Sequence, residues 1–444
     1  MDFWNRPLSE VTICTSNTQS LLGLTDEQGC AQIEVPEGSE IILTLFNRQS
    51  RIVRVNTSRI EVRLSDKDRL FDIGYDERIR KSESTASLSQ AVSEDIQASG
   101  NTTVMNNLYG LIPGLGVYQG SNLPWDNSPS LYVRGQGSFG GNQVLVLVDG
   151  IERDMAQISP KEVESITVLK DAASLALYGN RGADGVVVIT TKRGGDHGLR
   201  SQIDYNFGVQ TPFRIPHMAD GYTYASAVNE ALSNDGLSPR YTMHDMRLIA
   251  GHMHPQLFPD IDWQALILRK VAFTHDVNLT FDGKGQRIRY FVYANYNSNR
   301  GFLNNTEMND GYSTQIGMDA LKVRSNIEAR LTKSTVARIN LMGRLMQYQH
   351  PSAGTNLSGM YDTPAAAFYP LAPQSEGGGW VRSRLCKNPL ADLTSRGYNT
   401  VLQRTLFADL TIDQNLEMIT PGLSAQVRVA YDNSAEITDM RTCD

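Results

Sequence analysis

The stretch VAFTHDVNLTFDGKGQRIRYFVYANY, residues 271–296, consists of two alternating runs joined by a short polar turn. In the first run every second residue from Val271 to Phe281 is apolar except His275, and most residues between them are polar. The second run, residues 288–296, repeats the pattern. Successive side chains of a β-strand point to opposite faces. The stretch therefore predicts two long antiparallel strands, each with one apolar face and one polar face.

The same period of two recurs from about residue 200 to the end of the chain. It is found in Ile203–Val209, Tyr312–Leu321, Val323–Leu331, Val336–Met346, Leu402–Ile412 and Ala425–Tyr431. Together with the opening stretch, these segments predict about eight strands. Their connections alternate between short turns and long polar segments such as residues 349–400. Two-sided strands of about 10 residues, joined in this way, are typical of an outer-membrane β-barrel.

Charged residues on the polar face favour a barrel over a soluble sheet. Asp276, Arg289 and Arg324 all lie on that face, and the core of a β-sandwich would rarely tolerate such charges without partners. A soluble antiparallel sheet with one solvated face is the alternative. The barrel accounts better for the length of the strands and for an alternation that continues to the end of the chain.

Composition narrows the functional classes. The 41 basic and 48 acidic residues give a net charge of −7, without the basic stripe that nucleic-acid binding requires. There is no apolar run long enough for a transmembrane helix. The opening MDFWNRPLSE lacks the features of a signal peptide. Four cysteines lie far apart without metal-ligand spacing and are expected to be buried free thiols, with pairing of Cys14 and Cys30 as the alternative.

Residues 100–195 predict a compact α/β unit. Its candidate strands are SLYVR, QVLVLVDG, SITVLK and GVVVITT. Ser159–Glu162 has the pattern of a helix capping box, with Pro160 at the first helical position. Asp171 then precedes a short apolar helix that we expect to end at Gly179.

Residues 1–99 differ in pattern from the rest of the chain. Residues 1–65 contain the short β-runs SEVTICTS, TDEQGCAQIEV, SEIILTLFN, RIVRVN and IEVRLS, separated by turn residues, and predict a small non-catalytic β-sandwich. The charged segment that begins at Asp66 predicts an exposed linker. Residues 88–96 predict a short helix.

The stretch RGQGSFGG, residues 134–141, contains the spacing G-x-G-x-x-G of a dinucleotide-binding loop. Such a loop must follow a strand and open a helix, whose N-terminus then faces the phosphates. The residues that follow here, NQVLVLVD at 142–149, predict a strand instead. We therefore expect no nucleotide cofactor, and we interpret the glycines as a tight connection between two strands.

A longer set of motifs resembles a known family. From about Ser130 to Gly194, the segments VRG, VDGI, ISPKEVESITVLKDA, YGNRGADGVV and ITTKRG occur in the order seen in the plug domain of SusC/RagA-type TonB-dependent transporters. Residues 1–65 resemble the carboxypeptidase-regulatory-like β-sandwich that precedes this plug. Residues 256–300 resemble the first barrel strands. The implied fold is mainly β, with residues 66–84 as a linker and TonB-contacting region, residues 85–195 as the plug, and residues 196–444 as part of a transmembrane antiparallel β-barrel.

The resemblance implies TonB-dependent import of an oligosaccharide or peptide nutrient across the outer membrane, with the plug gating the barrel. The implied partners are the TonB–ExbB–ExbD energy-coupling complex, a SusD-like surface lipoprotein and the lipid bilayer. The plug and the N-terminal module would lie on the periplasmic side. No catalytic residue, metal site or cofactor is implied, so the chain is not expected to be an enzyme. The alternative is a ligand-binding or sensing outer-membrane β-protein without transport.

Two sets of residues follow from the resemblance and from exposed aromatic loops. The TonB-contacting segment is expected at Phe71, Asp72, Ile73, Gly74 and Tyr75, although LFDIGYDER departs from the usual Val-rich run. The loops that carry Trp125, Asn127 and Trp380 are expected to face substrate, with simple loop anchoring as the alternative.

The number of predicted strands is too small for a whole transporter barrel. A barrel of eight strands encloses room only for side chains, whereas a plugged transporter has about 22 strands. We therefore expect this chain to be a fragment that lacks its signal peptide and most of its barrel.

Overall fold

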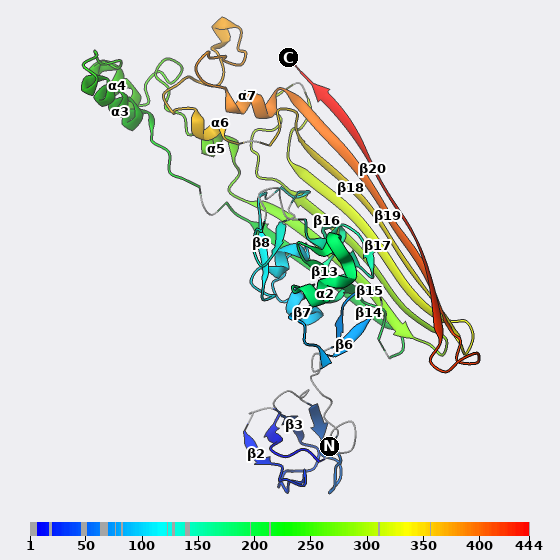
Figure 1. Cartoon of the computed structure of the whole chain (residues 1–444). Helices are drawn as coiled ribbons and strands as arrows, with labels where there is room; N and C mark the ends of the chain where they lie inside the picture. The colour runs from blue at the N-terminus through cyan, green and yellow to red at the C-terminus, as the bar shows by residue number, and fades with distance from the viewer. Residues whose placement is uncertain are drawn as a thin grey trace. The chain divides into compact units, whose positions relative to one another are not determined.

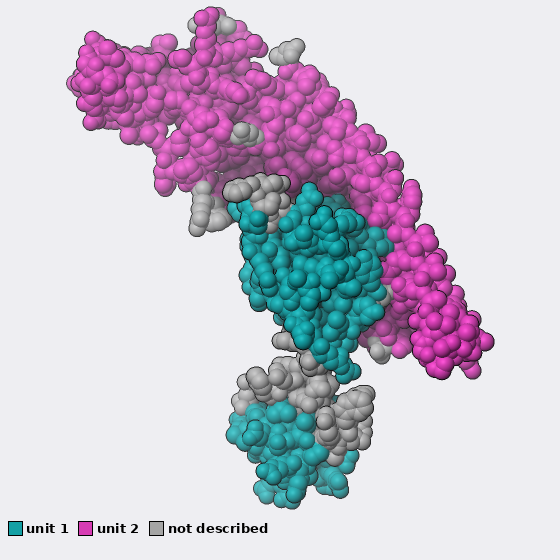
Figure 2. Space-filling view, viewed as in Figure 1, with its two compact units in different colours: residues 1–120, 128–191 teal, residues 121–127, 192–444 magenta. Residues whose placement is uncertain are grey.

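The computed structural model describes residues 7–16, 20–45, 51–62, 70–75, 77–80, 83–121, 123–126, 129–137, 143–195, 197–212, 215–309, 311–355 and 357–443. The chain divides into two compact units (Figure 2). The first contains residues 1–120 and 128–191, and the second contains residues 121–127 and 192–444. Figure 1 gives the labels of the helices and strands.

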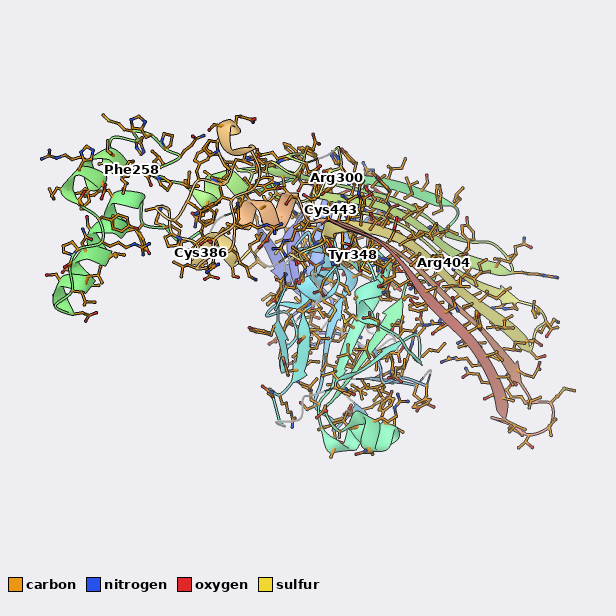
Figure 3. All side chains as sticks on the ribbon, turned by 90° about the horizontal axis from the view of Figure 1, so that it is seen from above. Phe258, Arg300, Tyr348, Cys386, Arg404 and Cys443 are labelled. Atoms are coloured by element: carbon orange, nitrogen blue, oxygen red, sulfur yellow. The ribbon has the colours of Figure 1, made fainter. Side chains whose placement is uncertain are left out.

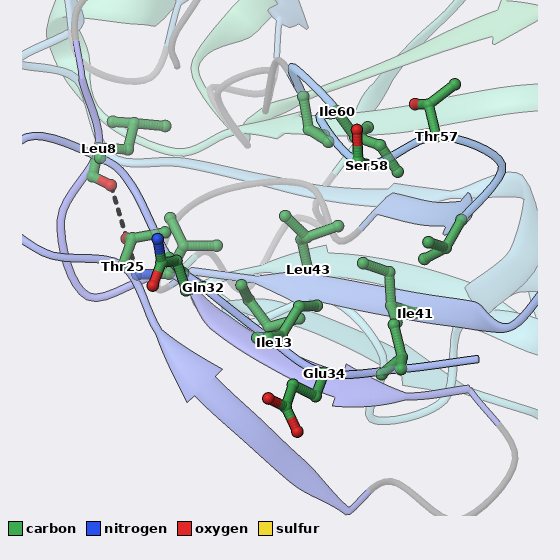
Figure 4. Close-up of a pocket in the computed structure, with 17 residues that line it drawn as sticks. Leu8, Ile13, Thr25, Gln32, Glu34, Ile41, Leu43, Thr57, Ser58 and Ile60 are labelled. Carbon is green, nitrogen blue, oxygen red and sulfur yellow. Dashed lines mark hydrogen bonds between the residues drawn. The ribbon is translucent and has the colours of Figure 1, made fainter. Parts of the chain in front are cut away.

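The N-terminal module is a four-stranded antiparallel sheet in the order β2-β1-β3-β4. Its strands are β1 (Thr12–Thr15), β2 (Leu21–Leu24), β3 (Glu40–Thr44) and β4 (Arg51–Arg54). Ile13, Ile41 and Leu43 line a cavity of about 860 Å³ on one face of the sheet (Figure 4). Thr25 and Leu8 also line the cavity, and the hydroxyl of Thr25 donates a hydrogen bond of 2.7 Å to the carbonyl of Leu8.

Two of the predicted strands in this module are wrong. Residues 25–35 and 60–62 form no strand, and residues 63–65 lie outside the described part of the chain. The strand Leu21–Leu24 was not predicted, because a glycine inside a short run weakens the strand pattern. Asp26 accepts hydrogen bonds from the backbone amides of residues 28 and 30, so the chain turns here.

The plug region contains a five-stranded sheet in the order β11-β10-β13-β12-β7. Its strands are β7 (Leu88–Val92), β10 (Leu145–Val148), β11 (Ile151–Glu152), β12 (Val163–Leu169) and β13 (Val186–Thr191). Strand β13 is buried along its whole length and pairs in parallel with β10. Val187 and Ile189 pack into a core on one face, while Val186 and Val188 pack into a core on the other.

Smaller elements complete this region. They are β5 (Leu70–Asp72), β6 (Arg78–Arg80), α1 (Ser93–Gln97), η2 (Met105–Leu108), β8 (Leu115–Tyr118), β9 (Ser130–Val133), η3 (Met155–Gln157), η4 (Pro160–Glu162), α2 (Ala172–Leu175) and η5 (Ala176–Gly182). The four predicted strands and the capping box are confirmed. The helix predicted over residues 88–96 is wrong in its first half, because Leu88–Val92 pairs with β12 and only residues 93–97 are helical.

The second unit is built on an open seven-stranded antiparallel sheet in which the strands follow the chain order. Its strands are β14 (Arg200–Gln210), β15 (Ala272–Lys284), β16 (Ile288–Arg300), β17 (Gly317–Arg330), β18 (Thr335–Pro351), β19 (Gly397–Asn415) and β20 (Ser424–Thr442). Among the described residues this is one strand fewer than predicted. Parts of the predicted segments Tyr312–Leu321 and Val323–Leu331 form the single strand β17, in which Lys322 is buried on the polar face, and residues 312–316 precede that strand.

The alternation predicted for β15 and β16 is confirmed by their register. Leu279 pairs with Ala294 and Val277 with Tyr296, so their apolar sides coincide. We use "apolar face" for the side of the sheet that carries Ile203, Phe273, Val292, Leu321, Leu341, Leu406 and Val429, and "polar face" for the side that carries Asp276, Asn295, Arg324, Asn340 and Asp409. In the described part of the chain, no helix is long and apolar enough to span a membrane.

The long connections of this unit contain helices. Between β14 and β15 lie α3 (Gly221–Asn234), α4 (Met243–Ala250) and α5 (Trp263–Ile267), and between β18 and β19 lie α6 (Gly359–Asp362), η6 (Gln374–Glu376) and α7 (Pro389–Thr394). Helices α5, α6 and α7 pack together through Trp263, Met360 and Leu390. The opposite end of the sheet has short turns, such as the one between Lys284 and Ile288.

All four cysteines are free. Cys30 is exposed, and Cys14, Cys386 and Cys443 are half-buried. The expectation that they are free is confirmed, whereas the expectation that they are buried is wrong. Cys14 lies in β1, whereas Cys30, Cys386 and Cys443 lie outside the helices and strands.

Candidate functional site

The five residues expected to contact TonB form a β-hairpin. Strands β5 and β6 pair through Leu70–Arg80, Phe71–Ile79 and Asp72–Arg78. The turn between them uses positive φ angles at Gly74 (87°) and Tyr75 (53°). Asp72 stabilises the turn, because its carboxylate accepts a 2.9 Å hydrogen bond from the amide of Gly74.

The hairpin is packed onto the plug sheet. Phe71 and Ile73 are 3% and 7% exposed. Ile73 contacts a core formed by Leu145, Leu147, Leu169, Tyr178, Val186 and Val188. The prediction that this segment is an exposed linker is therefore wrong for these two residues. Its many charged residues suggested a solvated chain, but Phe71 and Ile73, two positions apart on one face of the strand, are buried.

Tyr178 holds the turn in place. Its hydroxyl donates a hydrogen bond to the backbone carbonyl of Ile73. Its ring stacks on that of Tyr75, with 5.5 Å between the ring centroids and 20° between the planes. Burial raises the pKa of Tyr178 to about 12, with smaller contributions from Tyr75 and Asp72. The tyrosine is therefore a neutral donor throughout the physiological range.

Gly74 is required for this contact. A Cβ atom at position 74 would lie 2.0 Å from the hydroxyl oxygen of Tyr178, and the φ angle of 87° is one that other residues rarely adopt. Both the crowding and the backbone conformation thus select glycine here.

Two further hydrogen bonds join the hairpin to the sheet. The hydroxyl of Thr190 donates to the carboxylate of Asp72 at 3.0 Å. The side-chain amide of Gln90 donates to the carbonyl of Leu70 at 3.1 Å. The hairpin therefore meets three elements of the plug region, η5, β13 and β7. Tyr178 and Thr190 both lie in the plug motifs of the sequence, but no sequence pattern marks either of them as a contact of the hairpin.

Other polar residues of the plug motifs form hydrogen bonds and ion pairs with neighbouring loops and strands. Asp149 has a φ of 51° in the turn after β10, and its two carboxylate oxygens accept bonds from the amide and the hydroxyl of Thr191, at 3.0 and 2.6 Å. Arg181 forms an ion pair with Glu152. The ammonium of Lys170 donates to the carbonyl of Pro113 at 2.9 Å. These contacts fix the loops around the sheet and leave no nucleophile–base arrangement among them.

Asp171 caps helix α2. Its carboxylate accepts bonds from the amide and hydroxyl of Ser174 and from the amide of Ser87. The hydrogen bond from the Ser174 hydroxyl is the main cause that lowers the pKa of Asp171. The cap that the sequence predicted is confirmed.

The glycine loop has no helix after it. Arg134 and Gly135 have φ angles of 60° and 91°, residues 138–142 lie outside the described part, and the chain then enters strand β10. The interpretation of these glycines as a connection between strands is consistent with this geometry. The geometry lacks the helix N-terminus that a pyrophosphate would need.

Of the residues expected to face substrate, Trp125 is half-buried at the end of the sheet that carries the long connections. Its ring stacks on Tyr348, with centroids 4.6 Å apart and planes at 11°, and lies 5.6 Å from the ring of His350. It also packs against Met318 and Met346. These contacts anchor the loop, and Figure 3 marks Tyr348.

Trp380 is half-buried on the core of α5, α6 and α7, which Trp125 also contacts. It forms a bridge with Leu371, and the neighbouring backbone is held by a 2.8 Å bond from the amide of Ala372 to the carbonyl of Gly379. The structure thus places the two tryptophans on one apolar cluster. Asn127 lies outside the described residues.

Within the described residues, no group of three or more His, Cys, Asp or Glu side chains is placed to hold a metal ion. His252 instead lies 3.4 Å from the carboxylate of Asp260. A cavity of about 570 Å³ opens beside this pair and is lined by residues of the long connections, including Tyr224, Trp263 and Tyr361.

Comparison with known proteins identifies the plug region. Residues 80–186 match the family model described as TonB-dependent Receptor Plug Domain. The match runs from the last residue of β6 to the first residue of β13, so it contains β7, β10, β11 and β12 of the five-stranded sheet in full.

Relatives extend the similarity beyond the plug. TonB-dependent receptor P26 of Formosa agariphila is 29% identical over 321 residues, which is 69% of this chain and 30% of the relative. TonB-dependent receptor SusC of Bacteroides thetaiotaomicron is 25% identical over 296 residues, or 63% of this chain and 28% of the relative. The chain spans about a third of the length of the curated relatives it matches.

A solved structure supports the fold. The chain is similar to the RagAB peptide importer in its open-open state, with a TM-score of 0.66 and 20% identity over 83% of this chain and 43% of that chain. This similarity agrees with a plug followed by part of a TonB-dependent receptor barrel.

Proposed function

Because the chain belongs to the SusC/RagA type of TonB-dependent receptors, whose members lie in the outer membrane, we propose that the full protein imports an oligosaccharide or peptide nutrient across that membrane. The plug would gate the barrel. The similarity to RagAB, a peptide importer, supports the peptide half of this proposal. The seven-stranded sheet, with one apolar and one polar face, suits a wall between lipid and a wet interior.

The hairpin β5–β6 carries the proposal. Phe71, Asp72, Ile73, Gly74 and Tyr75 would contact the TonB–ExbB–ExbD complex. The exposed side of the hairpin offers Leu70 and Tyr75, which are 50% and 60% exposed. A two-stranded ribbon also has outer backbone groups that an added strand can pair with. Force applied to this hairpin would reach the plug sheet through Tyr178 and Thr190.

Substrate would be bound on the side of the long connections, under a SusD-like surface lipoprotein. Trp125, Asn127 and Trp380 are the positions we propose to face it. Both tryptophans are half-buried, so the exposed parts of their rings would contact substrate while the buried parts hold the loops.

Uptake measurements test the function. Cells that carry the full gene, cells that lack it and cells that lack TonB would be given labelled oligosaccharides and labelled peptides. Accumulation that requires both the gene and TonB supports import and names the substrate class. Ligand binding without accumulation would instead support the alternative, a ligand-binding or sensing protein.

A further inference from the structure

The apolar face of the sheet is interrupted by an arginine. On β19 this face carries Leu402, Leu406, Leu410 and Ile412, and Arg404 lies within the same row. The Arg404 side chain is exposed, and among the described residues it has no hydrogen bond or ion pair. By contrast, Arg300 at the end of β16 is paired with Asp319 at 3.0 Å. Figure 3 labels both arginines.

A glycine lies beside this arginine on the next strand. Gly343 of β18 is paired with Val323 on one side and Leu406 on the other. A Cβ atom at this position would meet nothing within 4 Å, and its φ angle is not positive. Neither crowding nor backbone conformation therefore requires glycine here. A glycine inside a strand often marks a place where a ligand approaches closely.

The missing side chain leaves a groove of about 460 Å³ on the apolar face. This Gly343 groove is lined by Leu321, Val323, Gly343, Arg344, Leu345, Arg404, Thr405, Leu406 and Asn433. Arg344 and Thr405 belong by register to the polar face, so Arg404 is the arginine that lines the groove from the apolar face. The strand pairing places the two residues next to each other. Leu345 is paired with Arg404, and Gly343 is paired with Leu406, which is the next residue after Arg404 on the apolar face of β19.

The position of Arg404 along the strand fits the edge of a membrane. The row from Leu402 to Ile412 spans about 33 Å along the strand, or about 25 Å in height at a tilt of about 40°, which matches the apolar band of a membrane barrel. Arg404 is the second residue of this row after Leu402, so its Cα lies about 5 Å below the edge of the apolar band by the same estimate. The edge concerned is on the side of the long connection between β18 and β19. An arginine can extend its guanidinium from such a depth to the level of lipid headgroups.

We propose that the Gly343 groove binds one phosphate-bearing lipid, with its phosphate on Arg404 and an acyl chain over Gly343. The planar guanidinium suits bidentate bonds to phosphate. A neutral lipid would leave Arg404 without a partner, and free phosphate would leave the groove unfilled. The inference rests on the proposed function only in that the apolar face must meet lipid.

Lipid retention tests this site. The full-length protein would be extracted from membranes in mild detergent, and bound phospholipid would be measured by native mass spectrometry and by phosphorus content. We expect about one tightly held phosphate-bearing lipid per protein. We expect Arg404→Leu and Gly343→Leu each to reduce its retention at least tenfold, the first by removing the cation and the second by filling the groove.

Arg300→Gln is the matched control, because it removes a surface arginine of the same sheet that already has a partner. It should leave retention unchanged. Full retention in both groove variants, or retention of neutral lipid or detergent only, would overturn the proposal. All variants are first checked for recovery in the membrane fraction. If the unmodified protein is not recovered there, the proposed membrane function itself fails, and that result is distinct from loss of the lipid.

Discussion

At the scale of single residues, one tyrosine joins segments that are far apart in the sequence. Tyr178 lies in η5, and its hydroxyl and ring both contact the turn at residues 73–75. No local pattern predicts such a contact, because the period of a strand or helix reports only which face of its own element a residue occupies. The motif YGNRGADG did identify the region as plug-like. It did not indicate that its tyrosine binds the hairpin.

Tyr178→Phe removes only the hydroxyl donor. A neutral hydrogen bond contributes about 1 kcal/mol net, so the hairpin should open about fivefold more often. Hydrogen exchange of the amides of Ile73 and Glu77, both bonded within the turn, would measure this in the full-length protein. Tyr118→Phe is the control, since Tyr118 is 66% exposed. Equal exchange in both variants would show that Tyr178 does not hold the turn.

The alkaline titration of Tyr178 follows from its raised pKa. The pKa is about 12 in the folded protein against an ordinary value of 10.0, because burial disfavours the charged form. The contribution of Tyr178 to hairpin docking is therefore complete below pH 10 and is lost as the pH rises through about 12. The difference in absorbance at the tyrosinate band between the native protein and Tyr178→Phe should show one transition near pH 12. A transition near pH 10 would mean that the residue is solvated.

At the scale of elements, the sequence was most informative where a strand has one apolar face. The alternation in β15 and β16 predicted their faces, because the short turn between them leaves few possible registers. It failed at β17, where a break was predicted near Lys322. Lys322 belongs to the polar face and is 7% exposed. The charged residue that suggested a turn between two strands therefore lies inside one strand of the sheet. Burial by neighbouring strands is not visible in a single segment.

Leu341 provides a test of the apolar face. It is exposed in the middle of β18 and is paired with Ala408, near the centre of the apolar row on β19. An arginine in the middle of a lipid-facing strand costs about 2–4 kcal/mol, and one near the interface about 0–1 kcal/mol. Leu341→Arg should therefore lower both the recovery of folded protein from the outer membrane and its free energy of unfolding in bilayers.

The control for this change lies on the same strand and the same face. Gln347 is paired with Leu402, at the edge of the apolar row, so Gln347→Arg should have little effect. Similar losses in the two variants would argue that the apolar face does not meet lipid.

At the scale of the whole molecule, the tertiary contacts of the aromatic loops were beyond the reach of sequence patterns. Trp125 was expected to face substrate, with loop anchoring as the alternative. Its ring packs on Tyr348 and His350, which come from a strand more than two hundred positions later. Stacking partners brought together by the fold leave no signal in either segment. The sequence nevertheless singled out Trp125 as the aromatic residue of its loop, with anchoring of the loop as one of its two expected roles.

The proposed function predicts that the hairpin must leave the plug sheet when TonB engages it. The carboxylate of Asp72 and the hydroxyl of Thr190 lie 3.0 Å apart, so a disulfide between Asp72→Cys and Thr190→Cys would fix the hairpin to β13. In cells that express the full-length double variant, we expect uptake of the labelled substrate to fall at least tenfold and to recover after mild reduction. The two single variants are the controls and should import under both conditions, because neither can form this bond. Normal uptake by the oxidised double variant, with the disulfide verified by mass spectrometry, would show that energy reaches the plug without release of residues 71–75.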